Sequence, residues 1–196
     1  MRHNPYAIVR MFEEEVAEYA GAPYGVAVDS GSNALFLCCE YLRVAQVTIP
    51  RRTYLSVPQS IIHAGGTVAF EDVDWQGMYQ LKPYPIYDAA KRFTSQMYVP
   101  NAFVCLSFHI KKHVKIGKGG MILTDNRTAA EWFKRARYEG RSEEGYRIDH
   151  VDMVGWNMYM TPVQAAQGLM LMQDMPATND DLVEVYPDLS TYGLFK

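Results

Sequence analysis

Two adjacent lysines, Lys111 and Lys112, follow an apolar run, and a lysine in that position can act as a nucleophilic amine. The run covers residues 102–106, and it leads through the sequence SFHIKK into a glycine-rich stretch. Burial and neighbouring cations lower the pKa of a lysine and expose the free amine that forms a Schiff base. The alternative is a solvated loop after a strand, which is the more common setting for a pair of lysines.

Two other groups of residues could bind the rest of a phosphorylated, flat ligand. The sequence Ser-Gly-Ser-Asn at 30–33 precedes an apolar helix, where exposed N–H groups and hydroxyls suit a phosphate, although Ser30 or Ser32 could also serve only as an N-cap. Asp88 ends an apolar run, where a partly desolvated carboxylate needs a partner such as a protonated ring nitrogen, or caps a helix. Tyr54 suits either core packing or stacking on a flat ligand.

The elements that must position these residues alternate between strands and helices. Helical spacing of apolar residues and short apolar runs give the boundaries. Helices are expected at 7–20, 34–42, 55–64, 128–138 and 162–172, and strands at 24–28, 46–49, 67–70, 85–87, 103–108 and 121–124. This order predicts an α/β fold, a three-layer αβα arrangement with a mainly parallel sheet. Ligands of such sheets bind beyond the carboxyl ends of the strands, where all the candidate residues lie.

Length and composition indicate one globular domain and argue against several classes of function. The chain has 196 residues, 48% apolar and 21% charged, and residues 176–196 form an acidic tail after a domain at 1–175. A net charge of -3 argues against a nucleic-acid-binding surface. No apolar run approaches the roughly 20 residues of a membrane-spanning helix. Three cysteines without metal-ligand spacing predict reduced thiols, no metal site and a cytoplasmic protein.

Taken in order, these motifs resemble the nucleotide-sugar aminotransferases of the DegT/StrS family, which bind pyridoxal 5'-phosphate (PLP) in the fold type I arrangement. The similarity runs from the helix at 12–21 to Gln164-Ala165-Ala166. The matching segments are 30–35 (an SGT-x-AL phosphate turn), 49–54 (P-x-x-T-aromatic), 63–74 (Ga-x-pvf-x-DvD), 87–90 (EDAA), 107–120 (SFH-x-x-K…GG) and 155–157 (G-x-N). The resemblance implies that residues 1–175 form the PLP-binding large domain.

The resemblance also implies a role for each candidate residue. Lys112 would hold PLP covalently and move the substrate proton, and Asp88 would pair with the pyridinium nitrogen. Relatives with a longer glycine loop would place the lysine at Lys111 instead. The other implied cofactor-binding residues are Gly31, Ser32, Asn33, Tyr54, Ala90, Ser107, His109 and, from a neighbouring subunit, Asn157.

The activity implied by the resemblance is amino transfer from an amino acid, often glutamate, to a keto-sugar nucleotide in polysaccharide biosynthesis. The expected assembly is a symmetric homodimer with shared sites, and the methionines of segment 158–172 are expected on its apolar contact face. Two alternatives remain: a PLP-binding protein with altered chemistry, and a non-catalytic interaction module that retains the fold.

The chain departs from the family pattern at positions that face the substrate. Lys91 stands where the family has His or Gln after the DAA block, Lys118 replaces the Glu before the two glycines, and Tyr159 replaces an Arg. Family members also have a C-terminal small domain that closes over the substrate, and this chain is expected to lack it. The resemblance therefore supports PLP binding better than it supports any particular substrate.

Overall fold

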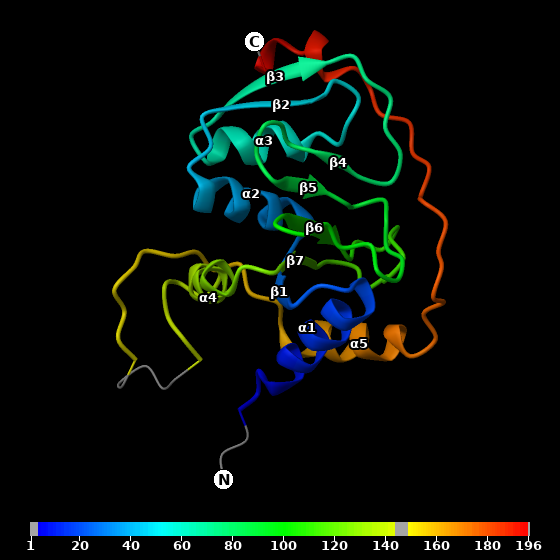
Figure 1. Ribbon diagram of the computed structural model, residues 1–196. Coiled ribbons are helices and arrows are strands. Elements are labelled where there is room, and N and C mark those ends of the chain that lie inside the picture. Colours follow the sequence, from blue (N-terminus) through cyan, green and yellow to red (C-terminus); the bar gives the residue numbers. More distant parts are fainter. Residues whose placement is uncertain (1–3, 144–148, 196) are drawn as a thin grey trace.

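The computed structural model describes residues 4–143 and 149–195, which fold around a central five-stranded sheet (Figure 1). The strands of this sheet lie in the order β1 (Tyr24–Val28), β7 (Gly120–Thr124), β6 (Phe103–Ser107), β5 (Ile86–Asp88) and β4 (Tyr79–Gln80). A separate parallel pair contains β2 (Gln46–Pro50) and β3 (Thr67–Glu71). Thr48 of β2 and Lys82, just after β4, exchange backbone hydrogen bonds of 2.8 and 3.0 Å, which join the two sheets.

Most of the described strands run in one direction, as predicted, although most hydrogen-bonded neighbours in the larger sheet are antiparallel. Strands β7 and β4 run opposite to their neighbours, and only β5 and β6 pair in parallel within that sheet. Because β7 lies between β1 and β6, these two strands still share one direction. The antiparallel bridge between Thr48 and Lys82 gives β2 and β3 the same direction. The carboxyl ends of β1, β2, β5 and β6 therefore meet at one edge.

Helices cover both faces of the sheet, which confirms the predicted three-layer αβα fold. Helices α2 (Gly31–Leu42), α3 (Ser56–His63) and α4 (Arg127–Ala136) share one core cluster with Val26 and Val28 of β1. Helices α1 (Ala7–Ala20) and α5 (Pro162–Met172) share the other with Ala27. This alternation along β1 follows from the two-residue period of a strand, which sends successive side chains to opposite faces.

Local contacts explain where the boundaries differ from those predicted. Helix α2 begins at Gly31 instead of residue 34, because the side chain of Ser30 accepts a hydrogen bond from the Asn33 N–H and caps the helix there. Helix α4 ends at Ala136 instead of residue 138, because the N–H groups of Trp156 and Met158 bond to the carbonyls of Ala136 and Arg137. The two-residue strand β4 and the 3-10 turns Leu189–Thr191 and Gly193–Phe195 are too short for a periodic signal.

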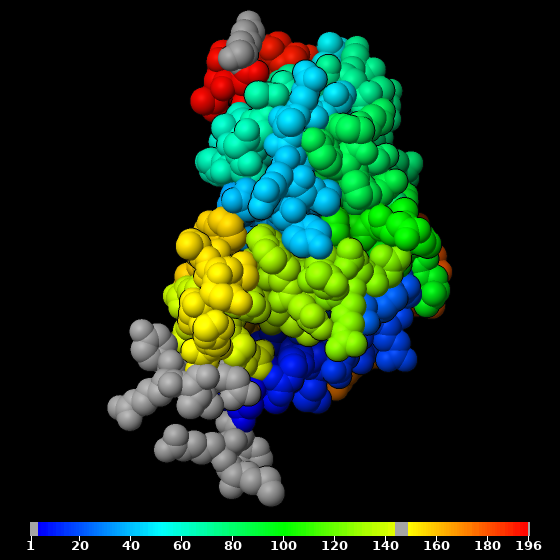
Figure 2. All heavy atoms as spheres, turned by 60° about the vertical axis from the view of Figure 1, so that its left-hand side comes forward, coloured from blue at the N-terminus to red at the C-terminus, as the bar shows by residue number. Residues whose placement is uncertain are grey.

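The segment at 149–161 lies against α4 on the outside of the molecule (Figure 2). The Trp156 N–H donates to the Ala136 carbonyl at 2.6 Å, and the Met158 N–H donates to the Arg137 carbonyl at 2.8 Å. Beneath them, the buried guanidinium of Arg137 donates to the buried Glu13 carboxylate of α1, which also accepts the Ala27 N–H at 2.9 Å. This network holds α1, β1 and α4 together.

An extended segment beyond α5, residues 177–188, runs along one side of the molecule toward β3 and is called the strap below (Figure 1). Its first residue accepts the Ser95 N–H at 3.0 Å. Farther along, the Arg92 guanidinium donates two hydrogen bonds, of 2.8 and 2.6 Å, to the Asp181 carboxylate. The Leu189 N–H then donates to the Arg51 carbonyl at 2.9 Å. The strap is thus bound to the domain along its length. Across the described residues, no helix has the length and apolar character needed to cross a bilayer.

Candidate active site

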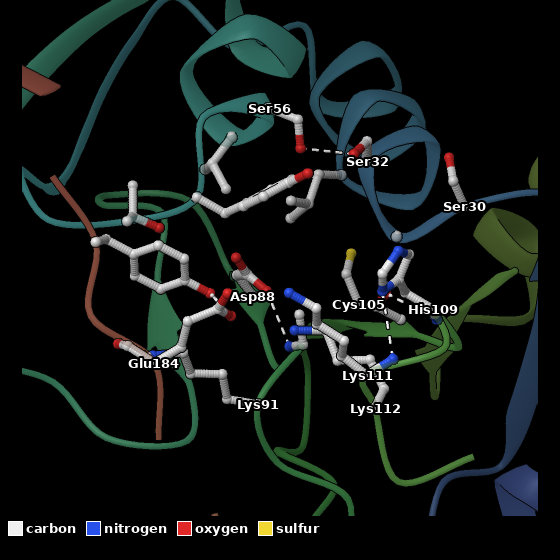
Figure 3. A pocket seen from close by; sticks show the side chains of 18 of the residues that line it. Ser30, Ser32, Ser56, Asp88, Lys91, Cys105, His109, Lys111, Lys112 and Glu184 are labelled. Carbon is white, nitrogen blue, oxygen red and sulfur yellow. Dashed lines mark hydrogen bonds between the residues drawn. The ribbon is translucent and has the colours of Figure 1, made fainter. Parts of the chain in front are cut away.

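A pocket of about 220 Å³ opens at the edge where β1, β2, β5 and β6 end (Figure 3). Its walls come from the first turns of α2 and α3, the end of β5, the turn after β6 and the strap. Most of the residues predicted to bind a cofactor line this pocket, and they are Gly31, Ser32, Tyr54, Asp88, Ala90, Ser107, His109 and Lys112. The fold therefore gathers residues that are up to about 80 positions apart in the sequence.

The pocket contains a polar seat where the first turns of two helices meet. The hydroxyls of Ser32 in α2 and Ser56 in α3 lie 2.6 Å apart. Both helices begin at the pocket, so their free N–H groups and the positive ends of their dipoles are near the same space. Hydroxyl and N–H donors in this arrangement bind phosphate.

Two glycines allow this seat to lie directly against the sheet. A Cβ at Gly31 would be 2.9 Å from the Ser107 Cβ at the end of β6. A Cβ at Gly120, the first residue of β7, would be 2.5 Å from the carbonyl carbon of Ser30. Neither distance is compatible with a side chain unless the backbone moves. The two glycines thus allow the polar seat to lie close to the residues at the end of β6.

Asp88, at the end of β5, is a buried carboxylate with room for one more partner. It is 5% exposed, and it accepts the Ala90 N–H at 2.9 Å and the Tyr79 hydroxyl at 3.1 Å. Thr53 holds that hydroxyl from the other side, at 2.5 Å. Burial raises the pKa of Asp88, while these two hydrogen bonds and the charges of Lys112 and Lys91 oppose the rise. A cationic ring N–H is the type of ligand group that would stabilise the charged form.

The two lysines of the SFHIKK sequence differ in their surroundings. The turn after β6 is closed by the Lys112 N–H, which donates to the His109 carbonyl at 2.8 Å. Lys112 is half-buried and Lys111 is exposed, and both line the pocket (Figure 3). Burial lowers the pKa of Lys91, and the positive charge of Lys112 lowers it further, as it also lowers that of Asp88. The positive charge of Lys112 therefore affects the pKa of two other residues that line the same pocket, Asp88 and Lys91.

Two predicted residues do not line this pocket. The Asn33 side chain donates to Asp29 at 2.6 Å and closes the turn at the start of α2. The Asn157 side chain is exposed and donates to Glu139 at 2.9 Å, in the segment that lies on α4. Asn157 was predicted to reach the site of a neighbouring subunit, and that role remains a prediction.

Sequence comparison agrees with this geometry. The profile of the DegT/DnrJ/EryC1/StrS aminotransferase family matches residues 3–99 and 98–190, which is nearly the whole chain. The chain belongs to this family.

Curated relatives of this family member include a "Spore coat polysaccharide biosynthesis protein SpsC" from Bacillus subtilis (strain 168). It is 24% identical over 236 residues, which cover 91% of this chain and 60% of the relative. A "GDP-perosamine synthase" from Escherichia coli O157:H7 is 24% identical over 226 residues, which cover 91% of this chain and 62% of that protein. The chain spans about 60% of the length of these curated relatives. The first alignment exceeds the 196 residues of the chain by 40, so SpsC has internal segments that this chain lacks.

Solved structures with the same fold include 3-amino-5-hydroxybenzoic acid synthase, with a TM-score of 0.73 and 20% identity. The similarity covers 85% of this chain and 55% of that one. Another is DesV from S. venezuelae, solved in complex with a ketimine intermediate, with a TM-score of 0.71 and 19% identity over 85% of this chain and 56% of that one. These similarities confirm the predicted aminotransferase large-domain fold.

Several residues of the pocket were not identified from the sequence of this family member. Ser56 lies two residues after Tyr54, and an N-cap search at the start of α3 would have drawn attention to it. Glu184 and Tyr186 come from the strap, nearly 100 residues after Asp88. No local pattern connects the strap to the pocket, so only the folded chain shows that these residues belong to it.

Proposed function

We propose that this chain binds PLP and transfers an amino group between an amino acid and a keto-sugar nucleotide. The observation that carries the proposal is that Lys112, the buried carboxylate of Asp88 and the Ser32–Ser56 seat all line one pocket. These are the groups that PLP requires: an amine for its aldehyde, an acid for its ring nitrogen and donors for its phosphate. The residues present therefore fit the cofactor.

Each residue would make a distinct contribution to the reaction. PLP, when bound, supplies the electron sink for bond changes at the substrate carbon. Asp88 would accept a hydrogen bond from the ring nitrogen and keep the proton there, and Tyr79 would hold the carboxylate in place. Lys112 Nζ would accept a proton from the reacting carbon of the substrate and return it. Tyr54, which is exposed at the pocket, would stack on the ring.

Relatives whose names refer to sugars support the proposed substrate class. GDP-perosamine synthase and the spore coat polysaccharide protein support a nucleotide-linked sugar as amino acceptor and a role in polysaccharide biosynthesis. An amino acid, with glutamate as the first to be tested, would be the donor. We place this reaction in the cytoplasm, in line with the reduced cysteines Cys38, Cys39 and Cys105, all of which are buried.

The test is the visible absorbance of the purified chain after addition of PLP, followed by an assay of amino transfer. Wild type and Lys111→Ala should show the band of lysine-bound PLP, and Lys112→Ala should lose both the band and the transfer. A band without transfer to any keto-sugar nucleotide would indicate altered PLP chemistry. The absence of a band in wild type would contradict the proposal and favour the interaction module.

We also propose a symmetric homodimer in which Asn157 enters the pocket of the partner. Exposed apolar side chains support a contact surface, among them Val154 and, on α5, Val163 and Met170. The methionine face is narrower than predicted, because Met160 and Met172 are buried in the core of their own chain. When Lys112→Ala and Asn157→Ala chains are mixed and allowed to exchange, part of the PLP binding should return. A monodisperse monomer that binds PLP would rule out the dimer.

A further inference from the structure

The strap forms one wall of the pocket, although it lies outside the motifs that carry the family resemblance. Two of its residues, Glu184 and Tyr186, line the pocket. Figure 3 shows Glu184 across the pocket from Lys112. The alternate residues Val183 and Val185 are 93% and 92% exposed. The strap thus presents alternate side chains to the pocket and to solvent, as an extended segment does.

Lys91 is the residue that fixes the strap at this point. Its ammonium donates to the Glu184 carbonyl at 2.8 Å, and its own carbonyl accepts the Leu182 N–H at 2.9 Å. Lys91 is only 6% exposed, so this pair of bonds joins a buried residue to the strap. The ion pair of the adjacent residue, Arg92, with Asp181 binds the strap at a point shortly before Glu184.

The same ammonium lies against two aromatic rings. It is 4.5 Å from the centroid of Trp75 and 4.3 Å from that of Tyr186. These two rings are nearly parallel, with an interplanar angle of 11° and centroids 6.1 Å apart. The Trp75 Nε1 donates to the Arg52 carbonyl at 2.8 Å, which fixes the orientation of the indole. Cation–π contacts therefore stabilise an aromatic wall with a defined geometry.

A carboxylate completes this wall. Glu184 lines the pocket, and one of its oxygens accepts the Tyr186 hydroxyl at 2.9 Å. An ionised carboxylate is an acceptor-only group with about four lone-pair sites, so Glu184 can accept further hydrogen bonds from a ligand. Aromatic faces pack against the C–H faces of a sugar ring, while carboxylate oxygens accept hydrogen bonds from its hydroxyls. A few oriented polar groups in an otherwise apolar wall are typical of a specific ligand site.

We propose that Glu184 and Tyr186 recognise the sugar of the nucleotide-linked substrate, and that Lys91 is the positioning residue that holds them. This inference rests on the proposed function for its substrate class. Glu184 accepts hydrogen bonds from sugar hydroxyls, and the rings of Tyr186 and Trp75 contact the sugar face. Lys91, which stands where the family has His or Gln, thus has a role in this chain: it binds the strap.

The test compares binding of a nucleotide sugar with binding of the bare nucleotide, by calorimetry on the chain supplied with PLP. The probes are UDP-glucose with UDP, GDP-mannose with GDP, and dTDP-glucose with dTDP. In wild type, the nucleotide sugar should have a lower Kd than the bare nucleotide in at least one of the three pairs. Glu184→Gln should reduce this preference on the order of tenfold, the loss of a charge-assisted hydrogen bond, with the Kd of the bare nucleotide unchanged. Val185→Ala, the matched control on the exposed side of the strap, should keep the wild-type preference.

The remaining outcomes distinguish a failure of sugar recognition by the strap from a failure of the proposed function. Lys91→Met should lower the sugar preference as Glu184→Gln does, while the visible band of bound PLP stays, because Lys112 and the Ser32–Ser56 seat are unchanged. Equal binding of all three pairs in wild type, or equal effects of Glu184→Gln and Val185→Ala, would overturn the inference. Inhibition of sugar-nucleotide binding by free glutamate that Glu184→Gln abolishes would also overturn it, since Glu184 would then recognise the donor ammonium. The PLP band is read separately, so its absence counts against the proposed function alone.

Discussion

The two walls of the pocket are built in opposite ways. The wall that we propose binds PLP, called the cofactor wall below, consists of residues at or shortly after the ends of strands, such as Ser32 after β1 and Asp88 at the end of β5. The strap wall combines Lys91 with Glu184, which meet only because a segment from the end of the chain crosses the pocket. Local chain geometry positions the first wall, and long-range contacts position the second.

The two walls also differ in how well other residues of the chain stabilise their carboxylates. Burial raises the pKa of Asp88, so its carboxylate is incompletely compensated by the protein alone. In the strap, hydrogen bonds from Arg92 lower the pKa of Asp181. A positively charged ligand group would therefore stabilise the Asp88 carboxylate, whereas Arg92 of the same chain already stabilises the Asp181 carboxylate of the strap.

Replacement of Asp88 by Asn should have the largest effect and should separate the walls most clearly. The amide cannot keep the ring nitrogen of PLP protonated, so amino transfer should fall on the order of 100-fold or more. The sugar preference of nucleotide binding should remain, because Glu184 and Tyr186 are unchanged. Measurements of transfer rate and of calorimetric binding check the two parts. A fully active Asp88→Asn variant would show that this carboxylate is not the ring partner.

The same variant gives a pH-dependent stability prediction for the chain without PLP. A carboxyl group whose folded pKa is raised stabilises the fold at pH below the unfolded pKa, and it loses that contribution as pH rises through the folded pKa. Asp88→Asn should therefore increase the free energy of unfolding near pH 7, and the increase should disappear toward pH 4. Urea unfolding at both pH values checks this. A variant that is less stable at pH 7 would contradict the role of burial.

Because the signals are local, the sequence predicted most of the residues that line the cofactor wall of the pocket, and their binding of PLP stays a prediction. A cap residue before an apolar helix marked residues 30–33, and an apolar run that ends in an acid marked Asp88. The alternation of strands and helices along the sequence also predicted the three layers. The antiparallel placement of β7 between β1 and β6 was not predicted, since strand order depends on contacts between distant segments. Glu184 was missed for the same reason, because an acidic segment without periodicity indicates a tail.

Asp181→Asn is expected to have a moderate effect confined to the strap wall. Loss of the charged partner of Arg92 should cost about 1 kcal/mol of stability near pH 7, because the pair is only partly buried. A depressed pKa gives stability above the unfolded pKa that is lost as pH falls through the folded pKa, so wild type and variant should converge below about pH 4. Urea unfolding gives the difference. A loss of PLP affinity in this variant would show that the two walls are not independent.

Thr161→Ala should have the smallest effect and should alter neither wall. Thr161 caps α5 in a capping box: the Gln164 side chain accepts the Thr161 N–H at 2.9 Å, and the threonine oxygen accepts the Gln164 N–H at 3.4 Å. Its loss should lower the free energy of unfolding by roughly 0.5 kcal/mol, the low end for a lost cap, because the bond from the Gln164 N–H is long. The PLP band and the sugar preference should stay at wild-type values. A change in either would mean that general destabilisation, and not a specific contact, controls that readout.

The most direct test of the cofactor wall is to identify which lysine carries PLP. The chain is saturated with PLP, reduced with borohydride, digested, and mapped by mass spectrometry. We expect the reduced cofactor on Lys112, with Lys111 and Lys91 unmodified. A label on Lys111 would contradict the assignment of the turn after β6, and a label on Lys91 would contradict its role as an anchor of the strap. An unlabelled chain would contradict PLP binding itself.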